Sequence, residues 1–197
     1  NNAVFEALTI EEFSGGFWVT TELSLTTDGP EPKILDNKAF VRFSHYNNEG
    51  MLDSQYAYDL ERIQRIPFLP FAINGLTEIL QLSKTEFITI ERSFSAGRGK
   101  KAHTAQIILS SIENATEVSA FDSIRDLDMN VMSKSLLINL KSIRRQLKNK
   151  AIDNIEGICF GPRLPYGNLS LILVADNNFN SFTQQQNQFI LLELINK

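Results

Sequence analysis

The sequence is poor in the residues from which most metal and nucleophile sites are built. Among its 197 residues there are one cysteine, Cys159, and two histidines, His45 and His103. A single cysteine excludes an intrachain disulfide and a thiolate zinc cage. Two histidines leave few ways to build a His-based metal site or a serine triad. Because Cys159 lies in the apolar run EGICF, we expect a buried, inert thiol.

Long apolar runs and concentrated positive charge are also missing. No window approaches 18 uninterrupted apolar residues, so we expect no membrane-spanning helix. The first ten residues, NNAVFEALTI, lack the features of a signal peptide and an initiator Met, which suggests a processed chain or part of a longer one. The net charge is −4, which argues against nucleic acid as the main partner. Two short basic clusters stand out: Arg98, Lys100 and Lys101, and Arg144, Arg145 and Lys148.

Helical patterns are scarce as well, and only residues 141–149 are predicted to form a short helix. Alternation of apolar and polar residues instead predicts many short strands separated by turn residues, which is typical of an all-β barrel, sandwich or propeller. The predicted strands are residues 4–10, 16–22, 38–45, 53–60, 76–82, 86–92, 104–111, 134–140, 155–160, 169–176 and 188–195.

An internal repeat favours the propeller. The segments FEALTI, TEILQL and IEGICF each have an acid followed by apolar residues two and four positions later. The strand after each segment ends on a second acid. The resulting pairs are Glu6 with Glu22, Glu78 with Glu91, and Glu156 with Asp176.

The strands divide into groups of four, four and three, over residues 1–66, 67–150 and 151–197. Four-stranded antiparallel units repeated radially are the blades of a β-propeller. The last group lacks a fourth strand, and three blades cannot close a ring. We therefore expect a single all-β domain of about three blades, part of a larger propeller whose N-terminal half is needed to complete it.

The three acid pairs are the main candidates for function. The start of the first strand and the end of the second lie at the same end of a hairpin, so the pairs should gather at the mouth of the central channel. Crowded carboxylates repel unless cations neutralise them. Ca²⁺, which prefers oxygen ligands, is one candidate, with Asp176, Asn177 and Asn178 forming an oxygen-rich cluster. Protein cations are the other candidates: Arg92, Arg98, Arg163 and Lys134. The acids could equally hydrogen-bond the next blade and be structural.

Two other features allow two readings each, and two more have a single reading. The glycine-rich basic stretch SAGRGKKAH, which ends at His103, could cradle a phosphate or form a mobile, solvated loop. His45 could be a general base near the channel or a surface residue. Trp18 is expected in the core. The segment QRIPFLPFAING is predicted to connect two blades.

Several separate segments, in order, resemble one known family. They are NNAVFEALTI, GGFWVTTELSL with Asp28-Gly29, SQYAYDL, NGLTEILQL, EFITIERSF, MSKSLLINL with Lys134, and NIEGICFGPRLPYGNLSLILVADNNF. Together they resemble the family called esterase-like activity of phytase, over nearly the whole chain. The resemblance implies a β-propeller longer than this chain and, for many members, an exported bacterial protein that is periplasmic or secreted. No motif of the family fixes a nucleophile, so no catalytic residue is assigned.

The resemblance and the acid pairs together predict a phytase-like or esterase-like propeller. We expect a Ca²⁺-dependent hydrolase of small phosphate or other esters, with its site at the channel mouth, as in β-propeller phytases that bind several Ca²⁺ ions there. The expected metal ligands are Glu6, Glu22, Glu78, Glu91, Glu156 and Asp176. The expected substrate-binding residues are Arg92, Arg98, Arg163 and Lys134. The alternative is a non-catalytic propeller scaffold that binds a ligand or partner and whose repeated acids are structural.

Overall fold

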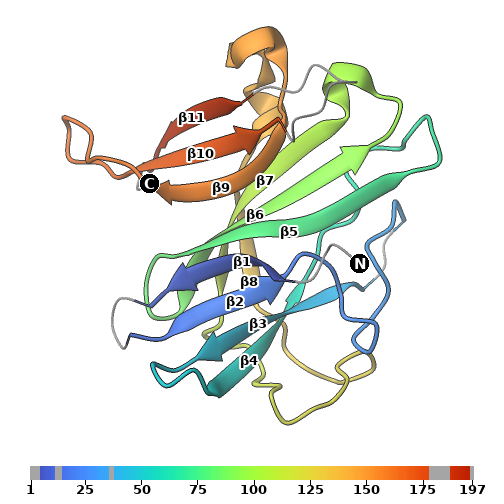
Figure 1. The fold of residues 1–197 in the computed structure, drawn as a ribbon, viewed down its shortest axis with the longest axis vertical. Helices are drawn as coiled ribbons and strands as arrows, with labels where there is room; N and C mark the ends of the chain where they lie inside the picture. The colour runs from blue at the N-terminus through green and yellow to red at the C-terminus, as the bar shows by residue number, and fades with distance from the viewer. Residues whose placement is uncertain (1–4, 12–14, 36–37, 178–186, 196–197) are drawn as a thin grey trace.

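The described residues form three antiparallel sheets (Figure 1). The computed structural model describes residues 5–11, 15–35, 38–177 and 187–195. The first sheet contains β1 (Phe5–Ile10), β2 (Phe17–Thr21), β3 (Phe40–Tyr46) and β4 (Leu52–Asp59). The second contains β5 (Ala72–Gln81), β6 (Glu86–Ser95), β7 (His103–Ser111) and β8 (Ser133–Asn139). The third contains β9 (Asn154–Phe160), β10 (Ser170–Asp176) and β11 (Gln188–Glu193). Each sheet joins its strands in chain order.

These elements confirm the predicted all-β class and the grouping of strands into four, four and three. Each predicted strand is present, with ends that differ by a few residues. The predicted helix over residues 141–149 is instead part of a series of short 3-10 turns. The series consists of η2 (Leu140–Ser142), η3 (Arg144–Gln146) and η4 (Lys148–Lys150), and a separate 3-10 turn, η1 (Gly99–Lys101), precedes β7. No helical segment in the described ranges is long and apolar enough to cross a membrane.

The first strands of the three sheets are neighbours. β5 lies between β1 and β9 (Figure 1), and hydrogen bonds join these strands across the sheet boundaries. Gln81 N donates to Thr9 Oγ1 at 3.2 Å, and Thr77 Oγ1 donates to the Ile155 carbonyl at 3.2 Å. First strands that meet along one line are consistent with neighbouring blades of a propeller, whose inner strands surround the axis.

The second sheet lies between the other two, and each of its faces packs against a neighbouring sheet. Strand β6 contributes side chains to both interfaces. Side chains along a strand alternate between faces. Phe87 belongs to the core shared with the first sheet, whereas Ile88 and Ile90 belong to the core shared with the third. Trp18, 4% exposed, packs edge-on against Phe87 with ring centroids 5.0 Å apart, which confirms its predicted core position. The sheets therefore pack face to face through interdigitated apolar side chains.

Cys159 corrects the prediction of a buried thiol, because its side chain is exposed. Strand β9 has a bulge between Ile155 and Gly157, which reverses the alternation of its side chains. Ile155 and Ile158 therefore both pack into the core shared with the second sheet. Cys159 consequently lies on the opposite face of β9, which is why an apolar run did not bury it.

Candidate functional site

A bulge at the same place in each sheet marks the candidate site. The first strand of each sheet has one extra residue opposite its second strand, and bulges re-aim side chains. In β1 the extra residue is Glu6, between Phe5 and Ala7. In β5 it is Thr77 and in β9 it is Glu156. The bulge position therefore carries an acid in the first and third sheets and a threonine in the second.

The partner strands show the same exception in the second sheet. Thr21, Glu91 and Ala175 occupy equivalent positions, each paired with the residue before the bulge. The next residues, Glu22, Arg92 and Asp176, are therefore equivalent to one another.

The sequence alignment of Glu78 and Glu91 with the other acids was wrong by one residue. A slip of one residue moves a side chain to the other face of a sheet. The spacing contained the signal, because Glu22 and Asp176 come five residues after Phe17 and Leu171, whereas Glu91 comes only four after Phe87.

Arg92 binds groups from all three sheets. From β6, its NH2 donates to Glu22 Oε1 at 3.0 Å, just after the end of β2. Its NH1 donates to Glu156 Oε1 on β9 at 2.9 Å and also to Asn154 Oδ1. The Arg92 side chain is 17% exposed and that of Glu156 is 37% exposed, so solvent reaches this site. Sequence reasoning missed Asn154, which starts β9 directly opposite Asp176.

Glu6 completes this group, which we call the Arg92 cluster: Glu6, Glu22, Arg92, Asn154 and Glu156. The Glu6 side chain is largely exposed, but neighbouring groups shield part of its carboxyl from solvent. This partial burial raises the pKa of Glu6 above its usual range. The nearby carboxylates of Glu22 and Glu156 raise it further, whereas Arg92 opposes them. Three ionised carboxylates and one guanidinium give the cluster a formal charge of −2.

Glu91 lies away from this cluster, in the interface between the first and second sheets. Its carboxylate is 1% exposed and accepts hydrogen bonds from Tyr58 Oη at 2.8 Å, Asn74 Nδ2 at 2.7 Å and Glu61 N at 2.8 Å. Lys134 Nζ lies 3.4 Å from Glu91 and 2.8 Å from Glu61. Burial raises the pKa of Glu91 and Lys134 opposes that shift. Glu91 and Lys134 thus satisfy each other inside the fold.

Glu78 occupies a third environment. It lines a groove of about 550 Å³ along β1, β5 and β9, together with apolar residues such as Leu8 and Ile158. Its carboxyl accepts hydrogen bonds from the backbone N–H groups of Ile79, at 3.0 Å, and Leu8. Burial without a nearby cation raises the pKa of Glu78 to about 7.

The two remaining predicted cations bind backbone elsewhere. Arg98 lies over the Phe68 ring, 3.6 Å from its centroid, and donates to the Ile66 carbonyl at 2.7 Å. Arg163 donates to the Gly167 carbonyl at 3.0 Å within the turn between β9 and β10. The predicted site residues that the structure brings together are therefore Glu6, Glu22, Arg92 and Glu156.

The two histidines have well-defined surroundings. His45 packs at a tilt against Trp18, and its ring nitrogens lie 3.1 Å from Glu11 Oε2 and 3.0 Å from Asp53 Oδ2. His103 begins β7 and packs against Phe94, with ring centroids 4.8 Å apart. Burial lowers the pKa of His103 to about 4. The two readings of the stretch that ends at His103, a phosphate cradle or a mobile loop, stay predictions.

The arrangement of acids does not fit a calcium cage. No group of three or more His, Cys, Asp or Glu side chains in the described part of the chain is placed to hold a metal ion. Glu22 and Glu156 already accept hydrogen bonds from Arg92, and Glu91 is enclosed by protein donors. Of the predicted oxygen cluster, Asn178 lies outside the described residues. We therefore derive no chemical step through a metal.

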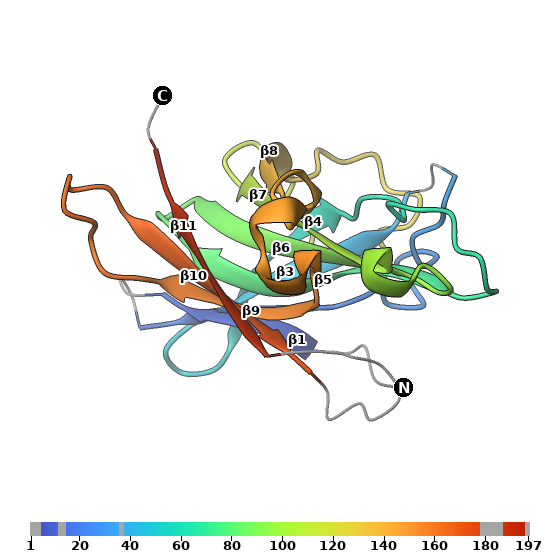
Figure 2. The same ribbon diagram turned by 90° about the horizontal axis from the view of Figure 1, so that it is seen from above.

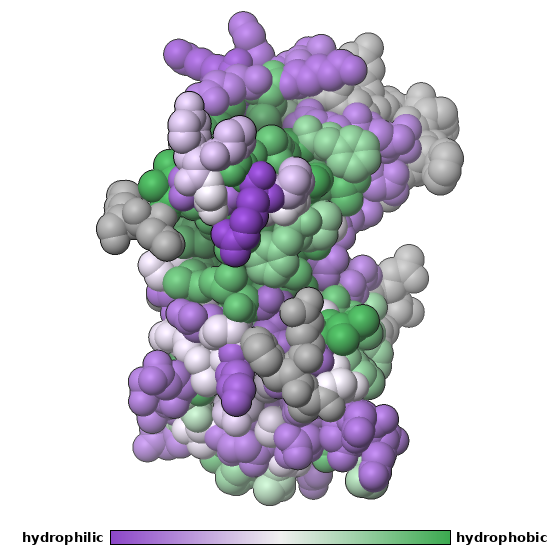
Figure 3. Space-filling view, turned by 90° about the vertical axis from the view of Figure 1, so that its left-hand side faces the viewer, coloured by the Kyte–Doolittle hydropathy of each residue, from purple (hydrophilic) through white to green (hydrophobic). Residues whose placement is uncertain are grey.

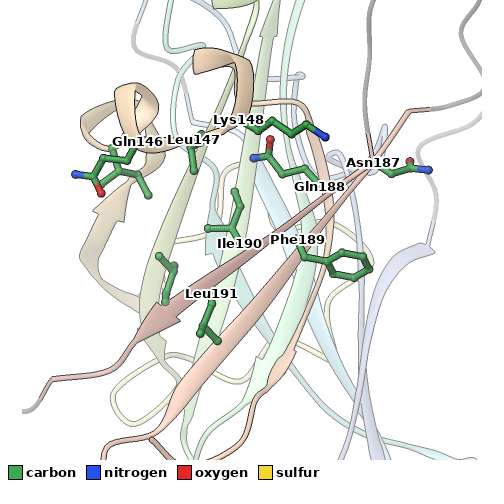
Figure 4. A pocket seen from close by; sticks show the side chains of 10 residues that line it. Gln146, Leu147, Lys148, Asn187, Gln188, Phe189, Ile190 and Leu191 are labelled. Atoms are coloured by element: carbon green, nitrogen blue, oxygen red, sulfur yellow. The ribbon is translucent and has the colours of Figure 1, made fainter.

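A separate groove of about 530 Å³ lies between the η3–η4 segment and β11 (Figure 4). Ile190 points toward this segment, and Gln188 lies close to Lys148 in the same view. The described residues that line the groove carry no carboxylate or imidazole. It is consequently a weaker candidate for acid–base chemistry than the Arg92 cluster.

Comparisons with known proteins agree with the all-β architecture. No curated protein and no solved structure matches the chain significantly. A protein family described as "Phytase-like: Esterase-like activity of phytase" matches residues 1–179, which is most of the sequence. The chain therefore belongs to the phytase-like family.

Proposed function

We propose that this phytase-like protein hydrolyses esters and that the Arg92 cluster is its site. The observation that carries the proposal is the meeting of polar side chains from three sheets at one end of the inner strands. There, a partly exposed guanidinium lies beside the exposed carboxylates of Glu6 and Glu156. Polar groups that converge from separate elements onto solvent are characteristic of binding sites.

The cluster contains the groups that ester hydrolysis needs. Glu6 is the general base: its carboxylate takes a proton from water as the water oxygen attacks the ester carbonyl carbon. Arg92 has five N–H donors, of which three are used in the hydrogen bonds described above. The remaining donors stabilise the oxyanion. Glu6 then returns the proton to the departing alkoxide, which leaves an acid and an alcohol.

The charge of the cluster favours an uncharged substrate. A formal charge of −2 repels a phosphomonoester dianion, whereas a neutral carboxylic ester is not repelled. We therefore propose a carboxylic ester as the preferred substrate, with phosphate esters requiring a divalent cation that screens the acids. Calcium dependence of phosphate-ester hydrolysis stays a prediction.

A substrate panel with the full-length protein tests the proposal. Hydrolysis of p-nitrophenyl butyrate and p-nitrophenyl phosphate is followed with Ca²⁺ and with a chelator. We expect turnover of the butyrate ester that a chelator does not abolish, and phosphate release that is slow and increases with Ca²⁺. Hydrolysis of neither ester above the background rate would reject the proposal. Preference for the phosphate ester in chelator would reject the charge argument.

The second candidate function is a non-catalytic scaffold. It is favoured by the way in which Arg92 ties Glu22 of the first sheet to Glu156 of the third. In that case the ion pairs of the cluster hold the sheets together as a structural lock, and the main effect of Arg92→Gln is a lower melting temperature. A functional cluster instead loses activity on replacement of Glu6, to which the described residues donate no hydrogen bond.

The cellular location of the protein is proposed from its family alone. An exported bacterial protein, periplasmic or secreted, agrees with the family expectation, and cell fractionation of the source organism tests it. Among the described residues, the third sheet has three strands where the other two have four. We propose that a segment from the rest of the propeller pairs with β11 and completes this blade.

A further inference from the structure

The loop before β5 exposes an unusual amount of apolar surface. Four of the six residues in the range 66–71 are large, apolar and between 57% and 71% exposed: Ile66, Phe68, Leu69 and Phe71. Isolated exposed apolar residues are common, but contiguous apolar patches mark interaction surfaces. The sequence suggested only a connection between blades here, and the ester site does not use it.

The loop is held in this conformation by specific contacts. Phe68 N donates to the Ala96 carbonyl at 2.9 Å, and Ala96 N donates to the Phe71 carbonyl at 2.9 Å. Arg98 covers one face of the Phe68 ring and donates to the Ile66 carbonyl. The apolar side chains are therefore presented outward by a fixed backbone.

Basic side chains lie beside the apolar loop. Arg98 is followed directly by η1, whose Lys100 and Lys101 are both exposed. Arg144 joins η3 to this turn, because its NH1 donates to the Lys100 carbonyl at 2.6 Å and its NH2 to the His103 carbonyl at 2.7 Å. The coiled turns lie toward the same side of the molecule in both ribbon views (Figures 1 and 2).

These segments concentrate positive charge in an otherwise acidic chain. Residues 96–103 and 139–152 together contain eight Lys or Arg residues and no Asp or Glu, whereas the whole chain carries −4. Arg144 is 8% exposed, and its Nε has no hydrogen-bond partner among the described residues. Burial lowers the pKa of Arg144, and the nearby Arg65 lowers it further. The two guanidinium groups add to the positive potential of this region, which attracts anions.

We propose that this basic apolar face docks onto an anionic lipid surface. The side chains of Ile66, Phe68, Leu69 and Phe71 enter the headgroup region, while the surrounding cations contact lipid phosphates. Apolar burial and attraction to anionic lipid act together in such interfacial binding. Ile66 and Leu69 are aliphatic, which favours lipid over single-stranded nucleic acid, whose bases stack on aromatic side chains.

The docking face lies at the same end of the second sheet as Arg92. Ala72, next to the loop, pairs with Ser95, and Gly75 pairs with Arg92. Three residues along a strand separate these pairs, which corresponds to about 10 Å. Docking therefore brings the Arg92 cluster close to the lipid surface. The inference stands whether or not the cluster is catalytic.

Vesicle co-sedimentation of the full-length protein tests the proposal. Neutral vesicles of phosphatidylcholine are compared with vesicles that contain 30% phosphatidylglycerol. We expect binding to the anionic vesicles that weakens as salt is added. The double variant Lys100→Gln/Lys101→Gln should bind about 30-fold more weakly, at about 1 kcal/mol per cation. Phe68→Ser should bind about tenfold more weakly.

Matched variants elsewhere on the surface are the controls. Lys38→Gln/Lys84→Gln removes two exposed lysines outside the face, and Met51→Ser removes an exposed apolar side chain from a different turn. Both should bind as the unmodified protein does. Equal affinity for neutral and anionic vesicles would overturn the proposal. Binding to heparin or anionic vesicles that Phe68→Ser leaves unchanged would also overturn it, because a soluble polyanion would then be the ligand.

Discussion

Replacing Glu78 by glutamine should make the protein more stable at alkaline pH. Glu78 lies in the groove along the inner strands, where burial raises its pKa from 4.5 to about 7. Glutamine keeps an oxygen for the hydrogen bonds from Ile79 and Leu8 and removes the charge. Between pH 4.5 and 7 the folded protein holds a proton that the unfolded chain releases. Its stability therefore falls as the pH rises through this range.

The size of the effect follows from the pKa difference. If the whole difference between pKa 4.5 and about 7 were expressed in stability, ionisation of Glu78 would destabilise the fold by roughly 3 kcal/mol. Glu78 is partly exposed, and solvent screening reduces this to ~1.5 kcal/mol. Above pH 8 the Glu78→Gln variant should therefore exceed the unmodified protein in free energy of unfolding by about that amount. At pH 4.5 or below the two should agree within about 0.5 kcal/mol.

Urea denaturation at pH 4.5 and pH 8.5 measures this difference. Glu113→Gln, which removes an exposed carboxylate from the loop after β7, is the control and should show no such pH dependence. Comparing variant with parent at each pH cancels the contributions of other titrating groups. A Glu78→Gln effect that is the same at both pH values, or destabilising at pH 8.5, would refute the assignment of Glu78 as a buried carboxyl without a counter-charge.

Three further predictions concern buried polar groups. Tyr58→Phe should destabilise the fold by ~1–3 kcal/mol, since it removes a donor from the enclosed Glu91 carboxylate. Asp28→Asn should cost ~3–5 kcal/mol, because it breaks a buried pair in which Arg42 Nε and NH2 lie 2.7 and 2.8 Å from the carboxylate. The imidazole of His103 should titrate in NMR near pH 4, and its contribution to stability should be lost as the pH falls from 6.5 toward 4.

These outcomes have matched controls and clear contradictions. Tyr166→Phe and Asp126→Asn alter exposed residues and should change the stability measured by denaturation by less than about 0.5 kcal/mol. If Tyr58→Phe or Asp28→Asn had equally small effects, the buried hydrogen bonds described here would be wrong. A His103 midpoint near 6.5 would show that its ring is solvated.

The sequence predicted the strands well because alternation and turn residues are local signals. It also placed Glu6, Glu22 and Glu156 at one end of the sheets, since strand direction determines which ends meet. It failed for Glu78 and Glu91 because the second repeat was aligned one residue out of register with the other two, and a slip of one residue moves a side chain to the other face of a sheet. The burial of Glu91 depends on Tyr58 from another sheet, which no local pattern reveals.

Exposure was the other quantity that local patterns predicted poorly. The inner strands carry apolar residues on faces that the described residues leave uncovered, including Leu8, Ile10 and Phe160. In Figure 3, apolar side chains gather over the upper half of the face shown, while polar side chains dominate below. An apolar run therefore did not imply burial, as Cys159 shows. The sequence did not reveal the docking face either, because its cations come from segments far apart in the chain.

The most direct test of the Arg92 cluster as a site is to measure kcat/KM and melting temperature on one preparation of full-length Glu6→Gln. Removing the Glu6 charge relieves repulsion from Glu22 and Glu156, so stability should not fall. If Glu6 is the general base, kcat/KM for p-nitrophenyl butyrate should fall at least ~100-fold while the melting temperature is unchanged or higher. An unchanged kcat/KM, or a loss of activity that only follows a lowered melting temperature, would contradict the account and favour a structural lock.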